Sequence, residues 1–132
     1  MTKFINLHTH TFSNLSDVME VVNQYPWEFD ASIPSYSIGI HPWYIDENRL
    51  ETDLETIKQK LQLDKCLALG ECGLDKRIEI PLELQISVFK QQLELVKETQ
   101  KPIVLHCVAA YDEVIAIKKE MKMENPMIIH GF

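Results

Sequence analysis

The sequence predicts one α/β domain in which buried parallel strands alternate with amphipathic helices. Two observations support this prediction: short runs rich in Ile, Val and Leu recur along the 132 residues, and segments with helical spacing lie between them. Strand, helix and strand in repeated order is typical of a parallel sheet with right-handed crossovers. No low-complexity tract interrupts the chain, so we expect a single domain over residues 1–132.

Five short apolar runs are expected to form the strands. None of them alternates cleanly between apolar and polar residues, as is typical of parallel strands that are covered on both faces. The runs comprise residues 4–7, 36–40, 66–69, 103–105 and 127–129.

Three segments between these runs have apolar residues three or four positions apart, which places those residues on one stripe of a helix. The stripes consist of Leu50, Leu54, Ile57 and Leu61, then Leu82, Ile86, Phe89, Leu93 and Val96, and finally Val114, Ile117 and Met121. Pro81 suits the first turn of the second helix. Residues 14–24 are a further helix candidate, closed by Tyr25-Pro26-Trp27.

The composition excludes several classes of protein. With 13 Lys and Arg against 20 Asp and Glu, the net charge is −7, which disfavours a protein that coats DNA by charge alone. No apolar run approaches the roughly 18 residues of a membrane span, and the first residues are too polar for a secretory leader. Three cysteines without a CxxC pair suit buried thiols in a reducing compartment. We therefore expect a soluble, cytoplasmic protein without a membrane partner.

A polar residue follows each predicted strand, at intervals of roughly 30 residues, about one βα unit. These residues are His8, His41, Glu71, His106 and His130. In a (β/α) barrel, the carboxyl ends of the strands meet on one face and carry the active site. The pattern therefore predicts a TIM-barrel type of α/β fold with its functional residues on that face.

The predicted barrel is incomplete within this chain. Eight βα units need about 250 residues, whereas we count about five units in 132 residues. We expect either the N-terminal portion of a longer barrel or an open sheet, whose unpaired edge favours self-association.

The histidines and Glu71 form a candidate metal site. His8 and His10 are two residues apart, so on a strand both side chains face the same way and can share one cation. Four imidazoles and one carboxylate exceed the needs of a single ion, and a carboxylate can bridge two. We therefore expect His8 and His10 at one metal, His106 and His130 at the other, and Glu71 between them. The simpler alternative for Glu71 is a capping or salt-bridging surface carboxylate.

Three further residues near this site have two interpretations each. His41 either touches substrate or only forms local hydrogen bonds. Asp75 either orients a ligand histidine or caps its loop, and we group both residues as candidates for substrate binding. Cys107 adjoins His106, but neighbouring residues on a strand face opposite sides, which disfavours a Cys–His nucleophile.

These motifs resemble those of the TatD family of metal-dependent hydrolases, which are (β/α)-barrel enzymes related to the amidohydrolases and best known as deoxyribonucleases. The matching stretches arrive in family order along the whole chain. They are Asn6-Leu7-His8-Thr9-His10, Gly39-Ile40-His41-Pro42-Trp43, residues 69–75 around Glu71, residues 102–107 up to His106-Cys107, and Ile129-His130-Gly131-Phe132.

The resemblance implies a deoxyribonuclease that uses two divalent ions, Mg²⁺, Mn²⁺ or Zn²⁺, to hydrolyse phosphodiester bonds of DNA or of a small phosphoester. Its implied ligands are His8, His10, Glu71, His106 and His130. The family carries a further aspartate, a metal ligand and general base, after its eighth strand, and that strand is absent from these 132 residues. Two alternatives stay open: an amidohydrolase-type enzyme that cleaves C–N or carboxylic ester bonds, and an inactive metal-binding half-barrel.

Overall fold

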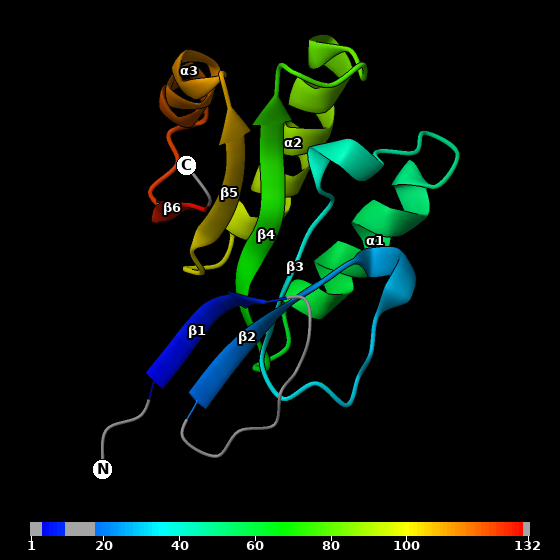
Figure 1. Ribbon diagram of the computed structural model, residues 1–132, viewed down its shortest axis with the longest axis vertical. Helices are drawn as coiled ribbons and strands as arrows, with labels where there is room; N and C mark the ends of the chain where they lie inside the picture. Colours follow the sequence, from blue (N-terminus) through cyan, green and yellow to red (C-terminus); the bar gives the residue numbers. More distant parts are fainter. Residues whose placement is uncertain (1–3, 10–17, 131–132) are drawn as a thin grey trace.

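The computed structural model describes residues 4–9 and 18–130, with side chains from Glu20 onward. Within these residues, six parallel strands form one sheet in the order of the chain, from β1 to β6. Figure 1 shows α1 and α2 side by side along the sheet, and α3 beside β5. β1 and β2 are turned away from the direction of β4 and β5, as the twist of a parallel sheet produces (Figure 1).

The bounds of the elements agree closely with the predicted runs. The strands are β1 (Phe4–Thr9), β2 (Val18–Gln24), β3 (Tyr36–Ile38), β4 (Cys66–Asp75), β5 (Ile103–Val108) and β6 (Met127–Ile129). The helices are α1 (Leu50–Leu61), α2 (Leu82–Lys97) and α3 (Tyr111–Met121), and short 3₁₀ turns cover Pro26–Glu28 and Pro42–Tyr44. All five predicted strands and the three striped helices are confirmed.

The core lies between the sheet and the helices. Ile57 of α1 and Phe89 and Leu93 of α2 are completely or almost completely buried, together with Leu69 and Leu105 of the sheet. The apolar stripes therefore face the strands, as their spacing predicts. Burial of this kind is the main favourable contribution to folding.

The helix predicted for residues 14–24 is wrong where the structure describes it, because Val18–Gln24 forms β2. Residues 14–17 lie outside the described residues. Val22 pairs with Tyr36 of β3, and the β-branched Val21 and Val22 are buried in the sheet. The polar residues Glu20 and Asn23 are buried in the sheet as well. The sheet therefore contains one strand more than predicted.

The last strand, β6, pairs only with β5 in the part of the chain that the structure describes. Its Ile128 and Ile129 are more than one-third exposed. Self-association through this edge stays a prediction. No helix among the described residues is both long and apolar enough to cross a bilayer.

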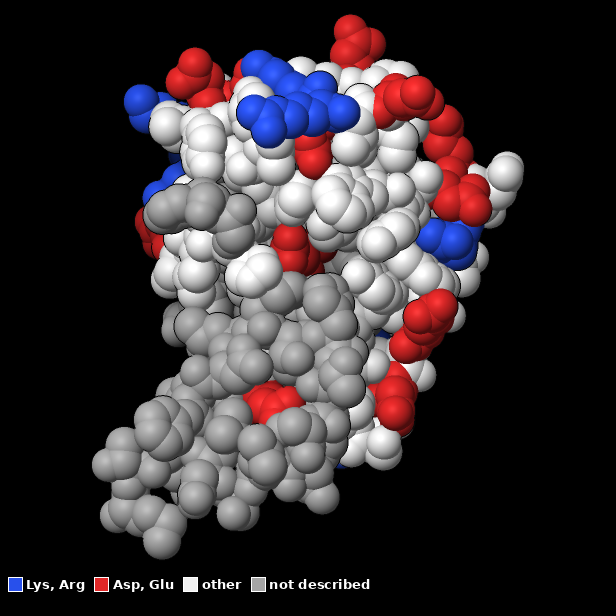
Figure 2. All heavy atoms as spheres, viewed as in Figure 1, with Lys and Arg blue, Asp and Glu red and all other residues white. Residues whose placement is uncertain are grey.

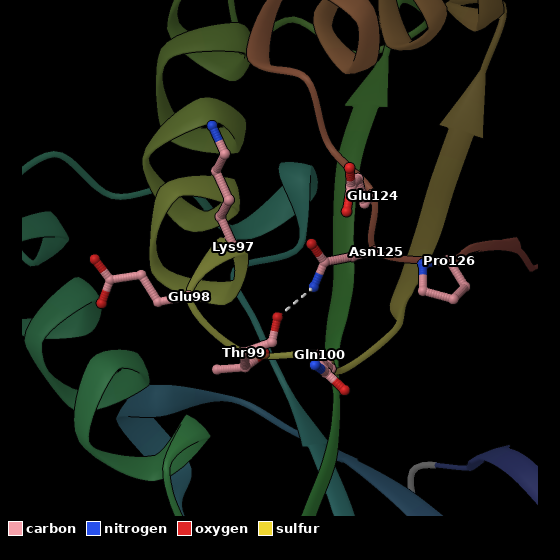
Figure 3. A pocket seen from close by; sticks show the side chains of 7 residues that line it. All are labelled: Lys97, Glu98, Thr99, Gln100, Glu124, Asn125 and Pro126. Atoms are coloured by element: carbon pink, nitrogen blue, oxygen red, sulfur yellow. Dashed lines mark hydrogen bonds between the residues drawn. The ribbon is translucent and has the colours of Figure 1, made fainter.

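A hollow lies where α2 ends and where β5 and β6 begin, at the opposite end of the sheet from the predicted site (Figure 3). Its Asn125 side chain is buried and donates to the carbonyl oxygens of Val96, Thr99 and Lys101. These bonds tie the start of β6 to the end of α2. These contacts give the hollow a structural explanation, and the predicted site residues lie at the other end of the sheet.

We predict that the three cysteines react very slowly in the folded protein. All three are buried and unpaired; burial raises the pKa of Cys66 to about 11 and also raises the pKa of Cys72 and Cys107. At pH 8, alkylation by iodoacetamide should be roughly 100-fold or more slower than in denaturant. Rapid labelling of all three thiols in native buffer, followed by mass spectrometry, would contradict the described core.

Candidate metal site

The buried carboxylate of Glu71 is the centre of the site. Glu71 lies within β4 and is only 4% exposed. Its Oε1 is 3.1 Å from Nδ1 of His106 and 3.5 Å from Nε2 of His41, and its Oε2 is 3.5 Å from Nδ1 of His130. The structure thus brings together Glu71 and His106, which lie within β4 and β5, and His41 and His130, which come after β3 and β6. The alternative of a surface carboxylate for Glu71 does not agree with its burial.

His106 lies between two carboxylates. Its Nδ1 faces Glu71, and its Nε2 is 2.9 Å from Oδ2 of Asp75 on the same strand as Glu71. The hydrogen bond with Glu71 raises the pKa of His106, burial opposes this effect, and Asp75 reinforces it. A carboxylate on one ring nitrogen fixes the orientation of an imidazole whose other nitrogen binds a metal. Nδ1 is therefore the nitrogen of His106 that would face a cation bound at Glu71.

Both interpretations of Asp75 are consistent with its contacts. Oδ2 accepts the indole N–H of Trp43 at 2.8 Å as well as facing His106, while Oδ1 accepts the backbone N–H of Arg77. Burial would raise the pKa of Asp75, but these hydrogen bonds outweigh it, and the pKa is lowered. The contact with His106 agrees with an orienting role, and the hydrogen bond from Arg77 agrees with a cap on the turn after β4. Direct contact with substrate stays a prediction for this residue, which is 3% exposed.

His41 is close to Glu71, but its hydrogen bonds favour a donor over a metal ligand. Its Nδ1 accepts the backbone N–H of Trp43 at 3.1 Å, in the short 3₁₀ turn that follows β3. A neutral imidazole that accepts at Nδ1 carries its proton on Nε2, which faces Glu71. A protonated nitrogen has no lone pair for a metal. This geometry supports the substrate-binding role that we predicted for His41, which itself stays a prediction.

The spacing of the donor atoms suits a divalent ion. Ligand atoms about 2.0–2.2 Å from an ion lie about 2.8–3.6 Å from their nearest neighbouring ligand atoms in tetrahedral or octahedral coordination. Glu71 and His106 have this separation. Ligand atoms of His41, Glu71 and His106 lie within 4.8 Å of one another, so His41 is near enough to bind the same ion, but only in the tautomer whose Nε2 is unprotonated. His130 faces the second oxygen of Glu71, and its side chain is about half exposed, so this side is open to solvent. The side chains of His8 and His10 lie outside the described residues, and their ligand role stays a prediction.

Asn23 and Tyr25 interact with Glu71, but the sequence did not predict either residue at the site. Asn23 of β2 accepts the backbone N–H of Glu71 at 2.5 Å, and the negative charge of Glu71 contributes, after burial and Tyr44, to the raised pKa of Tyr25. Both residues follow the run Val21-Val22 at the end of β2. The same rule that found the histidines, a polar residue after an apolar run, would have found them if residues 18–24 had been interpreted as a strand.

Gly73 allows β4 and β5 to approach closely at the site. Its φ of +141° suits glycine, and a Cβ built on it would lie 2.2 Å from the carbonyl oxygen of His106. Any larger residue would displace the strand that carries His106. The glycine thus contributes to the position of the imidazole beside Glu71 and Asp75.

Comparison with known proteins identifies the family. The model of the family described as TatD related DNase matches residues 1–132. The chain belongs to this TatD family. The resemblance that its five motifs suggested is therefore confirmed.

Other members of the TatD family contain a stretch that is similar to this chain. The chain is 34% identical over 108 residues to the uncharacterized metal-dependent hydrolase YabD of Bacillus subtilis strain 168, which covers 80% of the chain and 39% of YabD. It is 40% identical over 81 residues to the 3'-5' ssDNA/RNA exonuclease TatD of Erwinia billingiae, over 60% of the chain and 30% of that relative. The chain therefore spans well under half the length of these two relatives.

The fold agrees with a crystal structure of YjjV, a TatD homologue from Escherichia coli K12. The TM-score is 0.81 at 24% sequence identity, and the match covers 98% of this chain and 60% of YjjV. The likeness shows the fold: the six-stranded sheet and its helices correspond to a large part of a TatD-type structure. The predicted α/β fold class is confirmed.

We predict that Asp75→Asn weakens metal binding although it preserves the shape of the side chain. The variant loses the charge that orients His106, and the loss of such a partner typically costs 10–100-fold in metal affinity. Calorimetric titration with Mn²⁺ measures the change. Asp112→Asn is the matched control, because it removes the same charge from an exposed position in α3 and should bind as the parent does. Equal affinity of Asp75→Asn and the parent chain would refute the orienting role.

Proposed function

We propose that this chain carries the metal centre of a divalent-metal-dependent nuclease that hydrolyses phosphodiester bonds of DNA. The observation that carries the proposal is the buried Glu71 carboxylate, which His106 and His130 approach from the two strands that follow β4. Membership of the TatD family supports a metal-dependent hydrolase. The relative from Erwinia billingiae, named a 3'-5' ssDNA/RNA exonuclease, supports a nucleic-acid substrate and extends the proposal to RNA.

The donor set of the chain fits divalent ions. Glu71, His106 and His130 would hold one ion, and His8, His10 and Glu71 would hold a second, so that Glu71 bridges the two. Imidazole and carboxylate ligands accept Mg²⁺, Mn²⁺ and Zn²⁺ to different degrees, and we propose no preference among them. When bound, such ions polarise phosphoryl oxygens and lower the pKa of water toward neutrality.

The residues of the chain have distinct roles in this proposal. Asp75 holds the ring of His106 so that Nδ1 faces the oxygens of Glu71. His41 presents an N–H at Nε2 on the same side of Glu71, where it can donate to a non-bridging oxygen of the substrate phosphate. The side-chain oxygen of Asn23 accepts the backbone N–H of Glu71 and so holds the backbone at this position. These bonds preorganise the site before a substrate arrives, which is the main way in which a protein stabilises developing charge.

The proposed activity belongs to the whole protein of which such a site is part. The chain spans well under half the length of the two relatives from Bacillus subtilis and Erwinia billingiae. Metal binding is therefore the property that we assign most directly to this chain, and hydrolysis is assigned to the barrel in which all the ligands are assembled.

We predict that Glu71→Gln removes metal binding more severely than His41→Ala. Glutamine keeps the size of the side chain but loses the charge and one of the two oxygens needed to bridge two ions, so Mn²⁺ affinity should fall at least about 100-fold, whereas His41→Ala should change it less than about threefold. Calorimetry measures both the affinity and the number of ions bound. Normal stoichiometry in the glutamine variant would refute the bridging role.

Cleavage tests the substrate class separately. A short end-labelled DNA is incubated with Mn²⁺ and the chain, or with a version extended through three further βα units, and Glu71→Gln controls for contaminating nuclease. The proposal expects metal-dependent cleavage by the extended protein. Intact DNA together with bound metal and hydrolysis of an amide or carboxylic ester would overturn the nuclease assignment in favour of an amidohydrolase-type reaction.

A further inference from the structure

A group of exposed aromatic side chains adjoins the Glu71 site. Trp43 is 52% exposed and Tyr44 is 45% exposed, and both belong to the 3₁₀ turn that directly follows His41. Tyr44 packs edge-on against Tyr25, whose ring stacks on Trp27 at 4.9 Å and 8°. The aromatic group therefore consists of the stacked pair Tyr25 and Trp27 and of two rings, Trp43 and Tyr44, that face solvent.

Trp43 is the member of this group that touches the site. Its ring centroid lies 4.9 Å from that of His41 and 5.4 Å from that of His106, both in edge-on geometry. Its indole N–H donates to Asp75 at 2.8 Å, which fixes one edge of the ring. An indole that is held in this way loses little conformational entropy when a ligand packs on it, and it offers a large apolar face.

The charged groups at the site do not explain how a base of a nucleic acid would be held. The chain carries a net charge of −7, and Figure 2 shows the Lys and Arg side chains at the upper end of this face together with Asp and Glu side chains. Divalent ions at the Glu71 site would hold the phosphate, but contacts with phosphates leave the bases of the nucleic acid without a partner. Aromatic stacking on a base is independent of the charge of the protein and tolerates any sequence, because every base has a π-face.

We propose that Trp43 is the base-stacking residue of the substrate site, and that its exposed indole face takes the unpaired nucleobase of the nucleotide whose phosphate lies at Glu71. This inference rests on the proposed nuclease function. In a nucleotide, the base lies only a few ångströms from its phosphate, which matches the contact of Trp43 with His41 and His106. A base inside a duplex is already stacked on both faces, so the site selects unpaired ends.

The indole also has a structural role through Asp75, and two variants separate the two roles. Trp43→Phe and Trp43→Leu both lose the N–H that Asp75 accepts, but only the phenylalanine keeps an aromatic face. The difference in oligonucleotide affinity between these two variants therefore measures the contribution of stacking. The difference in affinity between the parent and Trp43→Phe measures the contribution of the hydrogen bond to Asp75. Circular dichroism and thermal unfolding verify that both variants fold.

Binding is measured without turnover, with a fluorescently labelled thymidine tetranucleotide that has phosphorothioate linkages, in Mg²⁺. We expect Trp43→Phe to bind within about threefold of the parent and Trp43→Leu to bind about tenfold more weakly, the loss of one stacked base. A matched tetranucleotide with an abasic residue at its 3′ end should bind the parent chain about tenfold more weakly than the intact tetranucleotide does. Trp43→Leu should bind the two oligonucleotides with nearly equal affinity.

Fluorescence of Trp43 reports the contact directly. The chain has two tryptophans, so a Trp27→Phe background leaves Trp43 as the single indole. The tetranucleotide should quench its emission, and the abasic counterpart should quench it much less. Equal binding of the two oligonucleotides with unchanged emission would overturn the stacking role and leave the nuclease assignment intact. Failure of the parent chain to bind the tetranucleotide, together with failure of the extended protein to cleave DNA, would overturn both.

Discussion

Burial of the Glu71 carboxylate is the constraint on which the rest of the site depends. An ionised carboxylate loses its hydration when it is buried, and this loss must be offset by hydrogen bonds or by positive charge. Its oxygens face the nitrogens of His41, His106 and His130, and Asn23 holds its backbone. A cation between the carboxylate and the imidazoles would provide the same compensation with full charge. The stability of this region and its metal chemistry are therefore linked.

The parallel sheet is what allows one carboxylate to meet several imidazoles. The carboxyl ends of neighbouring parallel strands lie side by side, so residues far apart in the chain converge without long loops. Gly73 lets β5 approach β4 at the height of His106, and Asp75, two residues further along β4, reaches the far nitrogen of that ring. The indole N–H of Trp43 donates a hydrogen bond to the same Asp75. One continuous set of hydrogen bonds thus joins the exposed indole to the buried carboxylate.

Much of this arrangement could be predicted from the sequence because it follows from local pattern. The apolar runs gave the strands, and the polar residue after each run gave His41, Glu71, His106 and His130. The segment of β2 could not be assigned in this way, since Glu20, Asn23 and Gln24 are polar residues that become buried only through contacts with neighbouring strands. Periodicity describes one segment at a time, and it misses a residue whose partner is far away in the chain. The tautomer of His41 also depends on a tertiary detail, the backbone N–H of Trp43 in a tight turn.

The central claim is that Glu71 and its histidines bind a divalent ion, and anomalous diffraction from a crystal soaked in Mn²⁺ tests it most directly. The account predicts a peak about 2.0–2.3 Å from a Glu71 oxygen and from Nδ1 of His106, with His130 as a further ligand and Nε2 of His41 outside the coordination sphere. Saturating Mn²⁺ with no anomalous peak near the Glu71 carboxylate, or with a peak bound only at surface carboxylates, would contradict it.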